Sequence, residues 1–254
     1  MQTLRTTSLP RRGFTLVELL VSVGIVACLI GMVLPAAGRA REVGRGVGCL
    51  SNLRQMTIAA RSYAINNEGR YPIAYAFGVR GLISYSYAWD LTTTWGPGQP
   101  TQVIPGLLWE GQGIERIQQC PSFEGEANWL ADPYTGYNYN TSFIGHGQYE
   151  AVPTPARMAA VRNPAGTAIF GDGQWSGGAN KFMRAPFPNP GDATFSGRWA
   201  GTQGFRHLGR TNVAFCDGHV ESLGESHTTN KDGGENVSEG TGFLSPDNSL
   251  YDLE

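Results

Sequence analysis

The chain has 254 residues, a formal net charge of −2 at pH 7 and a sequence pI of about 6.1, so it lacks the basic footprint of a nucleic-acid binder and we expect no nucleic-acid partner. Glycine contributes 35 residues and proline 15, while only 16% of residues are charged, which favours a loop-rich body with strands over a helical bundle. The four cysteines are too few and too scattered for a disulfide miniprotein, and the lack of a CxxC pair argues against a structural zinc site.

Residues 14–34 are long and apolar enough to cross a membrane as a helix. At about 1.5 Å per residue the segment spans about 31 Å, close to the roughly 30 Å of hydrocarbon in a bilayer. Thirteen of its residues are Leu, Ile, Val or Phe, and together they favour insertion by roughly 4–8 kcal/mol. This gain exceeds the few kcal/mol that the carboxylate of Glu18 costs near one end of the span. The segment is therefore predicted to insert.

The basic residues predict the orientation of this span. Arg5, Arg11 and Arg12 precede it without an acidic residue, so the N-terminus should stay in the cytoplasm and the chain after Pro35 should lie outside. We expect a single-pass protein of the inner, cytoplasmic membrane.

Three ordinary kinds of N-terminal segment explain these residues incompletely. A cleaved secretory signal would have a shorter apolar core, although LPAAG at residues 34–38 can serve as its cleavage site. A twin-arginine signal is suggested by Arg11, Arg12 and Phe14, but such signals have weakly apolar cores. A plain membrane anchor accounts for the length and the arginines and leaves Glu18 unexplained.

The sequence RRGFTLVELL at residues 11–20 resembles the leader of type IV prepilins and of the pseudopilins of type II secretion. Gly13, Phe14, Thr15, Leu16 and Glu18 match that motif at its spacing. The resemblance implies that a membrane-embedded prepilin peptidase cuts between Gly13 and Phe14 and methylates the new N-terminus. It also implies that other pilin-like subunits are partners.

Cleavage after Gly13 would explain the acidic residue in the span. The new α-amino group on Phe14 is a cation at the edge of the apolar phase, and a buried carboxylate is tolerated when it is paired. Glu18 can pair with the Phe14 amine of a neighbouring subunit and set the axial register of a filament. We therefore expect Glu18 to be an assembly residue.

One long helix is predicted from the span to about Asn67, where Asn67, Gly69 and Pro72 supply stop signals. Beyond the span, apolar and small residues recur at three- and four-residue steps and predict one buried face: Val43, Val47, Leu50, Thr57, Ala60 and Ala64. Four glycines weaken this part of the helix, by roughly 1 kcal/mol each relative to Ala: Gly38, Gly44, Gly46 and Gly48. They either allow local melting or mark a poor helix held by packing.

The body is predicted to contain short strands near residues 142–144, 168–171, 212–216 and 219–223. Asp217-Gly218 between the last two predicts a two-residue hairpin of type I′. A stretch rich in Tyr and Trp is interpreted mainly as core, with a sugar-binding surface as the alternative: Tyr63, Tyr71, Tyr75, Tyr85, Tyr87, Trp89 and Trp95.

The sequence contains a histidine, His207, followed after nine residues by Asp217 and Gly218. This pattern resembles the H-X9-DG signature at the C-terminus of many prepilin-like proteins of planctomycete- and Lentisphaerae-type bacteria. The fragments CLSNLRQMTIAARSYAINNEGRYP, CPS, YNYN and FGDG fit the same resemblance. We interpret Asp217-Gly218 as the hairpin turn and His207 as a residue that steadies it. The weaker hypothesis is a metal site of His207, Asp217 and His219, or a calcium site to which Asp172 adds an oxygen.

Cys28 lies in the span and should be free. In an oxidising compartment Cys49 and Cys120 can form a disulfide that would pin the body to the helix, and the resembled family carries cysteine at both positions. Cys120 with Cys216 is the competing pair.

These features predict an α+β, pilin-like fold in which a long N-terminal helix packs on a small antiparallel sheet. We expect a leader at residues 1–13, a transmembrane helix at 14–35, its continuation at 36–68, a globular head at 69–223, and a polar, mobile tail at 224–254 from which Phe243, Leu244, Leu250 and Tyr251 can dock back. The expected function is a non-enzymatic filament subunit without a cofactor. The alternative is a membrane-anchored protein that binds glycans or secreted substrates and uses the same processing route.

Overall fold

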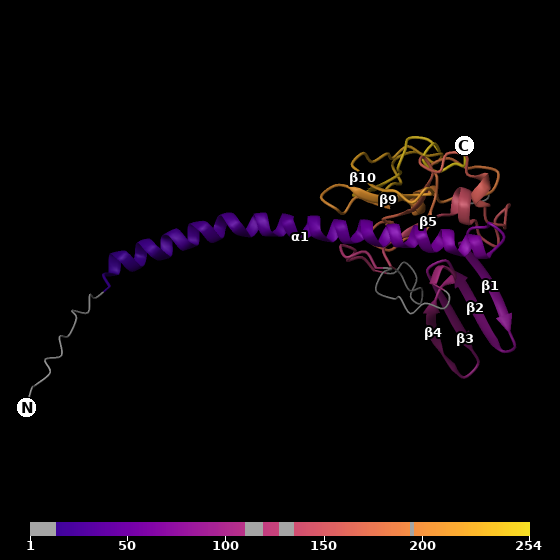
Figure 1. Ribbon diagram of the computed structural model, residues 1–254, viewed down its shortest axis with the longest axis horizontal. Coiled ribbons are helices and arrows are strands. Elements are labelled where there is room, and N and C mark those ends of the chain that lie inside the picture. Colours follow the sequence, from indigo (N-terminus) through magenta and orange to yellow (C-terminus); the bar gives the residue numbers. More distant parts are fainter. Residues whose placement is uncertain (1–13, 110–118, 127–134, 194–195) are drawn as a thin grey trace, which may run out of the picture. The chain divides into compact units, whose positions relative to one another are not determined.

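A computed structural model describes residues 14–109, 119–126, 135–193 and 196–254 (Figure 1). The chain divides into two compact units, residues 1–41 and 42–254. Helix α1, Leu16–Asn66, contributes its first part to one unit and its second part to the other. The predicted helix up to about Asn67 is therefore confirmed, and it includes Pro35 and all four glycines without a break.

In the first unit the apolar side chains of α1 remain exposed. The most apolar 18-residue window of the helix has a mean hydropathy of 2.6, and none of its residues is buried. Leu16, Leu20 and Leu34, for example, expose 66–78% of their surface. A helix in the core of a soluble protein would bury one face, so this part of α1 has the length and surface of a membrane-spanning segment.

In the second unit α1 buries a face that overlaps the predicted one only in part. Its buried residues are Cys49, Leu53, Met56, Thr57, Ala60 and Ala64. The prediction was right for the last three and wrong for Val43 and Val47, which are 55% and 62% exposed, while the predicted Leu50 is half-buried. The reason lies at Gly46, where an added Cβ would lie 3.6 Å from the ring of His207. The body thus approaches the helix beside its glycine, and the valines point elsewhere.

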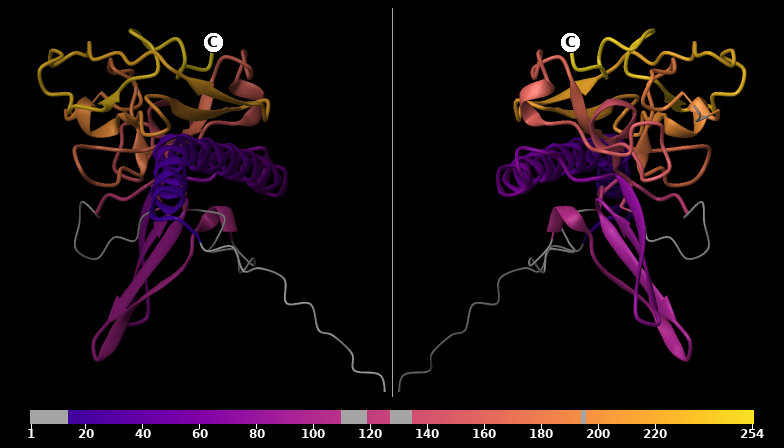
Figure 2. Two further views of the ribbon diagram at one scale, coloured as in Figure 1. Left: turned by 90° about the vertical axis from the view of Figure 1, so that its left-hand side faces the viewer. Right: turned by 90° about the vertical axis from the view of Figure 1, so that its right-hand side faces the viewer.

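The second unit contains an antiparallel meander, in the order β1-β2-β3-β4. Its strands are β1 Tyr75–Arg80, β2 Ile83–Ala88, β3 Leu91–Gly96 and β4 Gln99–Pro105. Figure 2 shows it on the opposite side of the second half of α1 from the strands β9 and β10. Of the seven aromatic residues that were interpreted as core, Trp89 and Tyr71 are buried and Trp95 is 39% exposed; the rest are half-buried.

A five-stranded sheet in the order β10-β9-β6-β5-β7 forms the rest of the body, together with a two-stranded ladder of β11 and β8. The strands are β5 Asn138–Asn140, β6 Ala168–Gly171, β7 Phe182–Met183, β8 Gln203–Gly204, β9 Thr211–Phe215, β10 Val220–Leu223 and β11 Thr241–Gly242. All pairs are antiparallel except β5 with β7. The α+β class with an antiparallel sheet is confirmed.

One predicted strand is wrong and one predicted turn has another form. Residues Thr141–Gly145 form a π-helical turn, because the side chain of Asn140 accepts a hydrogen bond from the N–H of Phe143 and turns the chain at the end of β5. The β9–β10 hairpin forms as expected. Residues 216–219 connect the two strands, with Gly218 at φ +100° and its N–H donating to the carbonyl of Phe215. Asp217 does not adopt the positive φ that a type I′ turn requires.

The last 30 residues are packed onto the body. Phe243 and Tyr251 are fully buried and Leu244 is 3% exposed, in a cluster with Met183 and Phe215. The hydroxyl of Tyr251 accepts a hydrogen bond from the N–H of Leu244 at 2.7 Å. The docking expected for these side chains is therefore present, and in the structure the segment is bound to the body instead of free.

Candidate functional site

The predicted processing site, Gly13 and Phe14, lies at the edge of the described residues. Gly13 lies outside them, and Phe14 is the first residue described, with 75% of its surface exposed. Thr15 and Glu18 form a reciprocal capping box at the start of α1. The Thr15 N–H and hydroxyl donate to Glu18 Oε2 at 2.9 and 2.8 Å, and the Glu18 N–H donates to Thr15 Oγ1 at 3.2 Å. Glu18 therefore has a local partner within the chain.

Sequence reasoning missed this capping box, although its signal was present. Thr15 followed three residues later by Glu18 at the start of an apolar run is the usual T-x-x-E signature of a helix start. The capping box explains the presence of Glu18 in a second way, besides pairing between subunits. Pairing with an amine requires the negative charge of Glu18, whereas capping requires only a side-chain oxygen that accepts hydrogen bonds.

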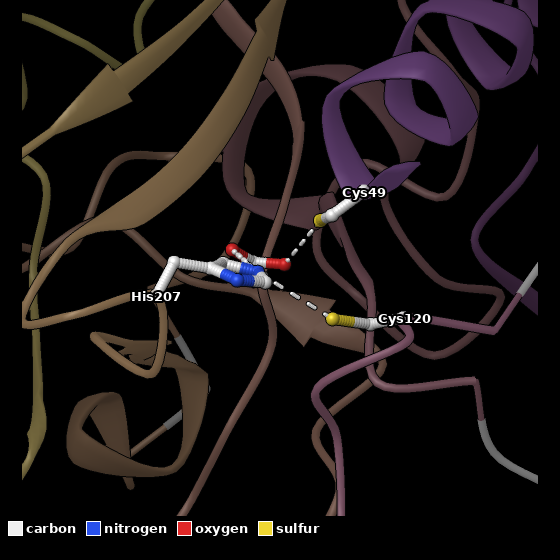
Figure 3. Close-up of side chains that lie close together, drawn as sticks. Cys49, Cys120 and His207 are labelled. Atoms are coloured by element: carbon white, nitrogen blue, oxygen red, sulfur yellow. Dashed lines mark hydrogen bonds and ion pairs between the residues drawn. The ribbon is translucent and has the colours of Figure 1, made fainter. Parts of the chain in front are cut away.

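A second site lies inside the body, where four segments bring potential metal ligands together. Cys49 comes from α1, Cys120 from the chain before the turn at Pro121, Asp172 from the end of β6 and His207 from the turn between β8 and β9. Figure 3 shows both sulfur atoms and the His207 ring directed toward one centre. All four residues are buried, and one ligand atom from each lies within 4.8 Å of the others.

The closest contacts in this cluster join unlike groups. Cys49 Sγ lies 3.0 Å from Asp172 Oδ1. His207 Nε2 lies 3.2 Å from Asp172 Oδ2 and 3.6 Å from Cys120 Sγ. The Asp172 carboxylate thus lies between the Cys49 thiol and the His207 ring. The His207 ring in turn lies between this carboxylate and the Cys120 thiol.

A surrounding layer orients the four groups. His207 Nδ1 lies 3.0 Å from Glu42 Oε1, and Glu42 also accepts a hydrogen bond from Ser122 at 2.6 Å. The Asn212 N–H donates to Asp172 Oδ2 at 2.7 Å. Arg206 lies 3.4 Å from Cys120 Sγ and 3.2 Å from Asp172 Oδ1. The positions of the ligand atoms are therefore held by second partners.

The electrostatics favour the charged forms of Cys120, Asp172 and His207 and the neutral thiol of Cys49. Burial alone would lower the pKa of His207, but hydrogen bonds to Asp172 and Cys120 raise it to about 10. Burial would raise the pKa of Asp172, and the charge of Arg206 with the His207 hydrogen bond hold it below its usual value. The hydrogen bond from Cys49 lowers the pKa of Cys120 to about 5 despite burial. Burial raises the pKa of Cys49.

The structure does not assemble the predicted set of His207, Asp217 and His219. Asp217 Oδ1 accepts from the His219 N–H at 2.9 Å and lies 2.6 Å from its Nδ1, within the half-exposed hairpin turn. His219 also stacks on Phe215, with ring centroids 4.4 Å apart. The partners of His207 are those of the buried cluster, so the Asp217–His219 pair belongs to the hairpin alone.

His207 has a turn of its own instead of steadying the one at Asp217. Its N–H donates to the carbonyl of Arg210 at 3.0 Å, and the Arg210 N–H donates back at 3.1 Å. Between them Leu208 and Gly209 both have positive φ, as in a type I′ turn. The turn type expected at residues 217–218 therefore occurs at 208–209, where it aims the imidazole at α1.

No disulfide joins the described cysteines, and all four are free thiols. Cys49 and Cys120, the expected pair, lie in the same cluster. Cys216, the competitor, instead lies beside the hydroxyl of Tyr71, and burial raises the pKa of its thiol to about 12. The structure places the two cysteines of the predicted disulfide in a four-residue cluster without a covalent bridge.

Comparison with known proteins agrees with the N-terminal motif. Residues 9–34 match a family model described as the prokaryotic N-terminal methylation motif. No curated protein and no solved structure matches the chain. The match covers about a tenth of the chain and confirms a prepilin-type N-terminal methylation motif followed by an apolar helix. The H-X9-DG resemblance stays a prediction.

Proposed function

We propose that the chain is a non-enzymatic pilin-like or pseudopilin-like subunit. It is cut between Gly13 and Phe14 by prepilin peptidase, methylated on Phe14, and assembled into a filament of the type IV pilus or type II secretion kind. The observation that carries the proposal is the methylation motif at residues 9–34, placed directly before and within the exposed apolar part of α1.

The surface of α1 supports an assembly role. A largely apolar and exposed helix needs lipid or other apolar helices around it, because water would oppose the exposure of so many leucines and valines. Before assembly the bilayer can supply this environment, with the N-terminus in the cytoplasm and the body outside. In a filament the helices of neighbouring subunits take the place of lipid.

Glu18 supports the same proposal through its position. It lies four residues after the amine that cleavage would create on Phe14, at the exposed start of α1. In a bundle of such helices the amine of one subunit and the carboxylate of another can neutralise each other in a region without water. The pairing would favour one axial offset between subunits.

The first test is the N-terminal mass of the full chain recovered from its native membranes. We expect a chain that begins at methylated Phe14. A chain that retains Met1, or one cut near Ala37, would contradict processing by prepilin peptidase. A blocked site provides the control, because Gly13→Leu should leave the leader attached while the chain stays in the membrane.

The second test separates a filament subunit from an anchored binding protein. Mechanical shearing of cells should release the processed chain in sedimentable filaments, whereas an anchored protein would stay with the membrane fraction. Retention of a correctly processed chain in membranes after shearing would contradict assembly and leave processing intact.

A further inference from the structure

We propose that Cys49, Cys120, Asp172 and His207 bind one divalent metal ion, Zn²⁺ by preference, in a closed structural site inside the body. The inference goes beyond the proposed function, because it concerns how the body is held on α1 whether or not the chain enters a filament. It also replaces the predicted ligand set with one drawn from four separate segments.

The contact distances match the edges of a tetrahedron around zinc. Zn–S bonds of about 2.3 Å and Zn–N or Zn–O bonds of about 2.1 Å imply ligand–ligand edges of roughly 3.4–3.8 Å at tetrahedral angles. The observed Cys120–His207 and His207–Asp172 contacts are 3.6 and 3.2 Å. The Cys49–Asp172 contact of 3.0 Å is about 0.6 Å shorter than such an edge, and it involves Oδ1, whereas His207 contacts Oδ2. Binding would therefore require a rotation of the carboxylate and an outward shift of the Cys49 side chain.

Glu42 orients His207 in the way that a metal site needs, and an incoming ion would displace the proton from Nε2. A metal-binding imidazole is neutral, and it usually donates its other N–H to a carboxylate. Glu42 Oε1 lies 3.0 Å from Nδ1, on the far side of the ring from the cluster. Donation from Nδ1 to Glu42 leaves the Nε2 lone pair directed at Asp172 and Cys120, where the ion would lie.

The formal charges also balance around a divalent ion. Two thiolates and the Asp172 carboxylate carry three negative charges, and the buried guanidinium of Arg206 contacts two of these ligands. A divalent cation supplies the remaining two positive charges. A bound ion requires both thiols to be deprotonated and His207 to be neutral, so metal binding would release the protons that these groups carry.

The ligand types select zinc over calcium and a closed site over an open one. Thiolates and imidazole favour zinc among the common divalent ions, whereas calcium requires six or more oxygen ligands. Four protein ligands complete the zinc shell and leave no position for a substrate. Because the ligands come from α1, the Cys120 segment, β6 and the His207 turn, the ion would fasten the helix to the sheet.

The experiment uses the full chain, solubilised in detergent and purified without a metal-affinity step or a chelator. Inductively coupled plasma mass spectrometry should find close to one zinc per chain. After the zinc has been removed and Co²⁺ has been added, the visible spectrum should show the absorption of tetrahedral Co²⁺ with thiolate ligands.

Variants assign the ligands. Cys49→Ser and His207→Ala should each lose the cobalt spectrum, while Cys28→Ser, which changes an exposed cysteine outside the cluster, should keep it. Glu42→Gln should retain the spectrum and weaken Co²⁺ affinity by about 10- to 100-fold, because it removes the carboxylate that orients His207.

Three results would overturn the proposal. The first is wild-type chain that takes up neither Zn²⁺ nor Co²⁺ while its four thiols titrate as free. The second is a Cys49–Cys120 disulfide, found by peptide mass spectrometry, in chain taken directly from membranes. The third is a metal that stays bound in both Cys49→Ser and His207→Ala. If the variants do not fold, the stoichiometry and cobalt spectrum of the wild-type chain still decide the question.

Discussion

His207 and Asp172 face each other inside the body, with His207 Nε2 3.2 Å from Asp172 Oδ2. The carboxylate is completely buried and the imidazole is 6% exposed. Asp172 also accepts hydrogen bonds from Cys49, Arg206 and the N–H of Asn212. One carboxylate therefore connects α1, β6, β9 and the turn that follows β8.

Replacing Asp172 should destabilise the body strongly. Asp172→Asn leaves the buried Arg206 without its counter-charge, and breaking a buried charge pair from one side costs about 3–5 kcal/mol. Loss of a bound metal would act in the same direction. We expect a large drop in the thermal unfolding midpoint of the detergent-solubilised chain. Asp217→Asn is the matched control in the half-exposed hairpin and should cost less than about 1 kcal/mol. Equal effects of the two variants would contradict the central position of Asp172.

Variants of Glu18 and Thr15 should distinguish the two roles of Glu18, pairing between subunits and helix capping, by their effects on filament assembly. Glu18→Gln keeps an oxygen that can accept the capping hydrogen bonds but removes the charge that would pair with the Phe14 amine. Losing an interaction of about 1.4 kcal/mol reduces an association constant about tenfold, so we expect incorporation into sheared filaments to fall at least tenfold. Thr15→Val removes the hydroxyl and keeps the charge of Glu18. It should leave incorporation nearly unchanged, and a larger loss with Thr15→Val would favour the capping role.

Stability should fall at acidic pH partly through Asp192. Burial would raise the pKa of Asp192, but hydrogen bonds from Arg198 and Ser142 and the Arg198 charge hold it below its usual value. The unfolded carboxyl titrates near pH 3.9, so the stabilisation is complete well above that pH and is lost as the pH falls through the lower folded value. Unfolding followed between pH 7 and pH 2 should show this decline. Asp192→Asn should make the acid limb shallower, and an unchanged limb would contradict the assignment.

Gly218 should be required for the β9–β10 hairpin because of its backbone conformation. Its φ of +100° is strained for any residue with a side chain, although an added Cβ would meet nothing closer than 3.7 Å. Gly218→Ala should therefore destabilise the chain by about 1–2 kcal/mol. Gly177→Ala is the control, since Gly177 has open space around it and no positive φ. Thermal unfolding of both variants measures the difference, and equal midpoints would contradict the strain argument.

Tyr251 should hold the C-terminal segment on the body. Its side chain is fully buried and its hydroxyl accepts from the N–H of Leu244. Tyr251→Ala should cost about 3–5 kcal/mol, as for other large buried aromatic residues, and should expose residues 224–254 to limited proteolysis. Tyr149→Ala, at a residue that is 73% exposed, should change neither property. A wild-type chain whose residues 224–254 are cut as fast as those of Tyr251→Ala would support the mobile tail predicted from composition.

Much of the fold could be predicted because its signals are local. An apolar run, the arginines before it and the stop signals near Asn67 act on neighbouring residues, and they predicted a helix over residues 14–68, two residues longer at each end than α1. The hairpin of β9 and β10 followed from two short strands beside Asp217-Gly218. The strand predicted at residues 142–144 was wrong because the side chain of Asn140 turns the chain before it can extend.

Local signals could not predict which side of α1 is buried against the body, nor which residues form the buried cluster. Val43 and Val47 fit the apolar period as well as Cys49 and Leu53 do, and only the contact of Gly46 with His207 decides which side faces the body. The lack of a CxxC pair argued against a structural zinc site, yet that rule covers ligands close together in sequence. Here Cys49 and Asp172 are separated by 123 positions.

The sequence by itself determined the apolar span, its methylation motif, the long helix and the terminal hairpin, because each depends on residues that are neighbours along the chain. The tertiary structure alone decided that Cys49, Cys120, Asp172 and His207 meet, and that Asp217 and His219 stay apart from them. These contacts depend on how segments that are distant in the sequence pack on one helix. The spacing of residues along the chain does not predict that packing.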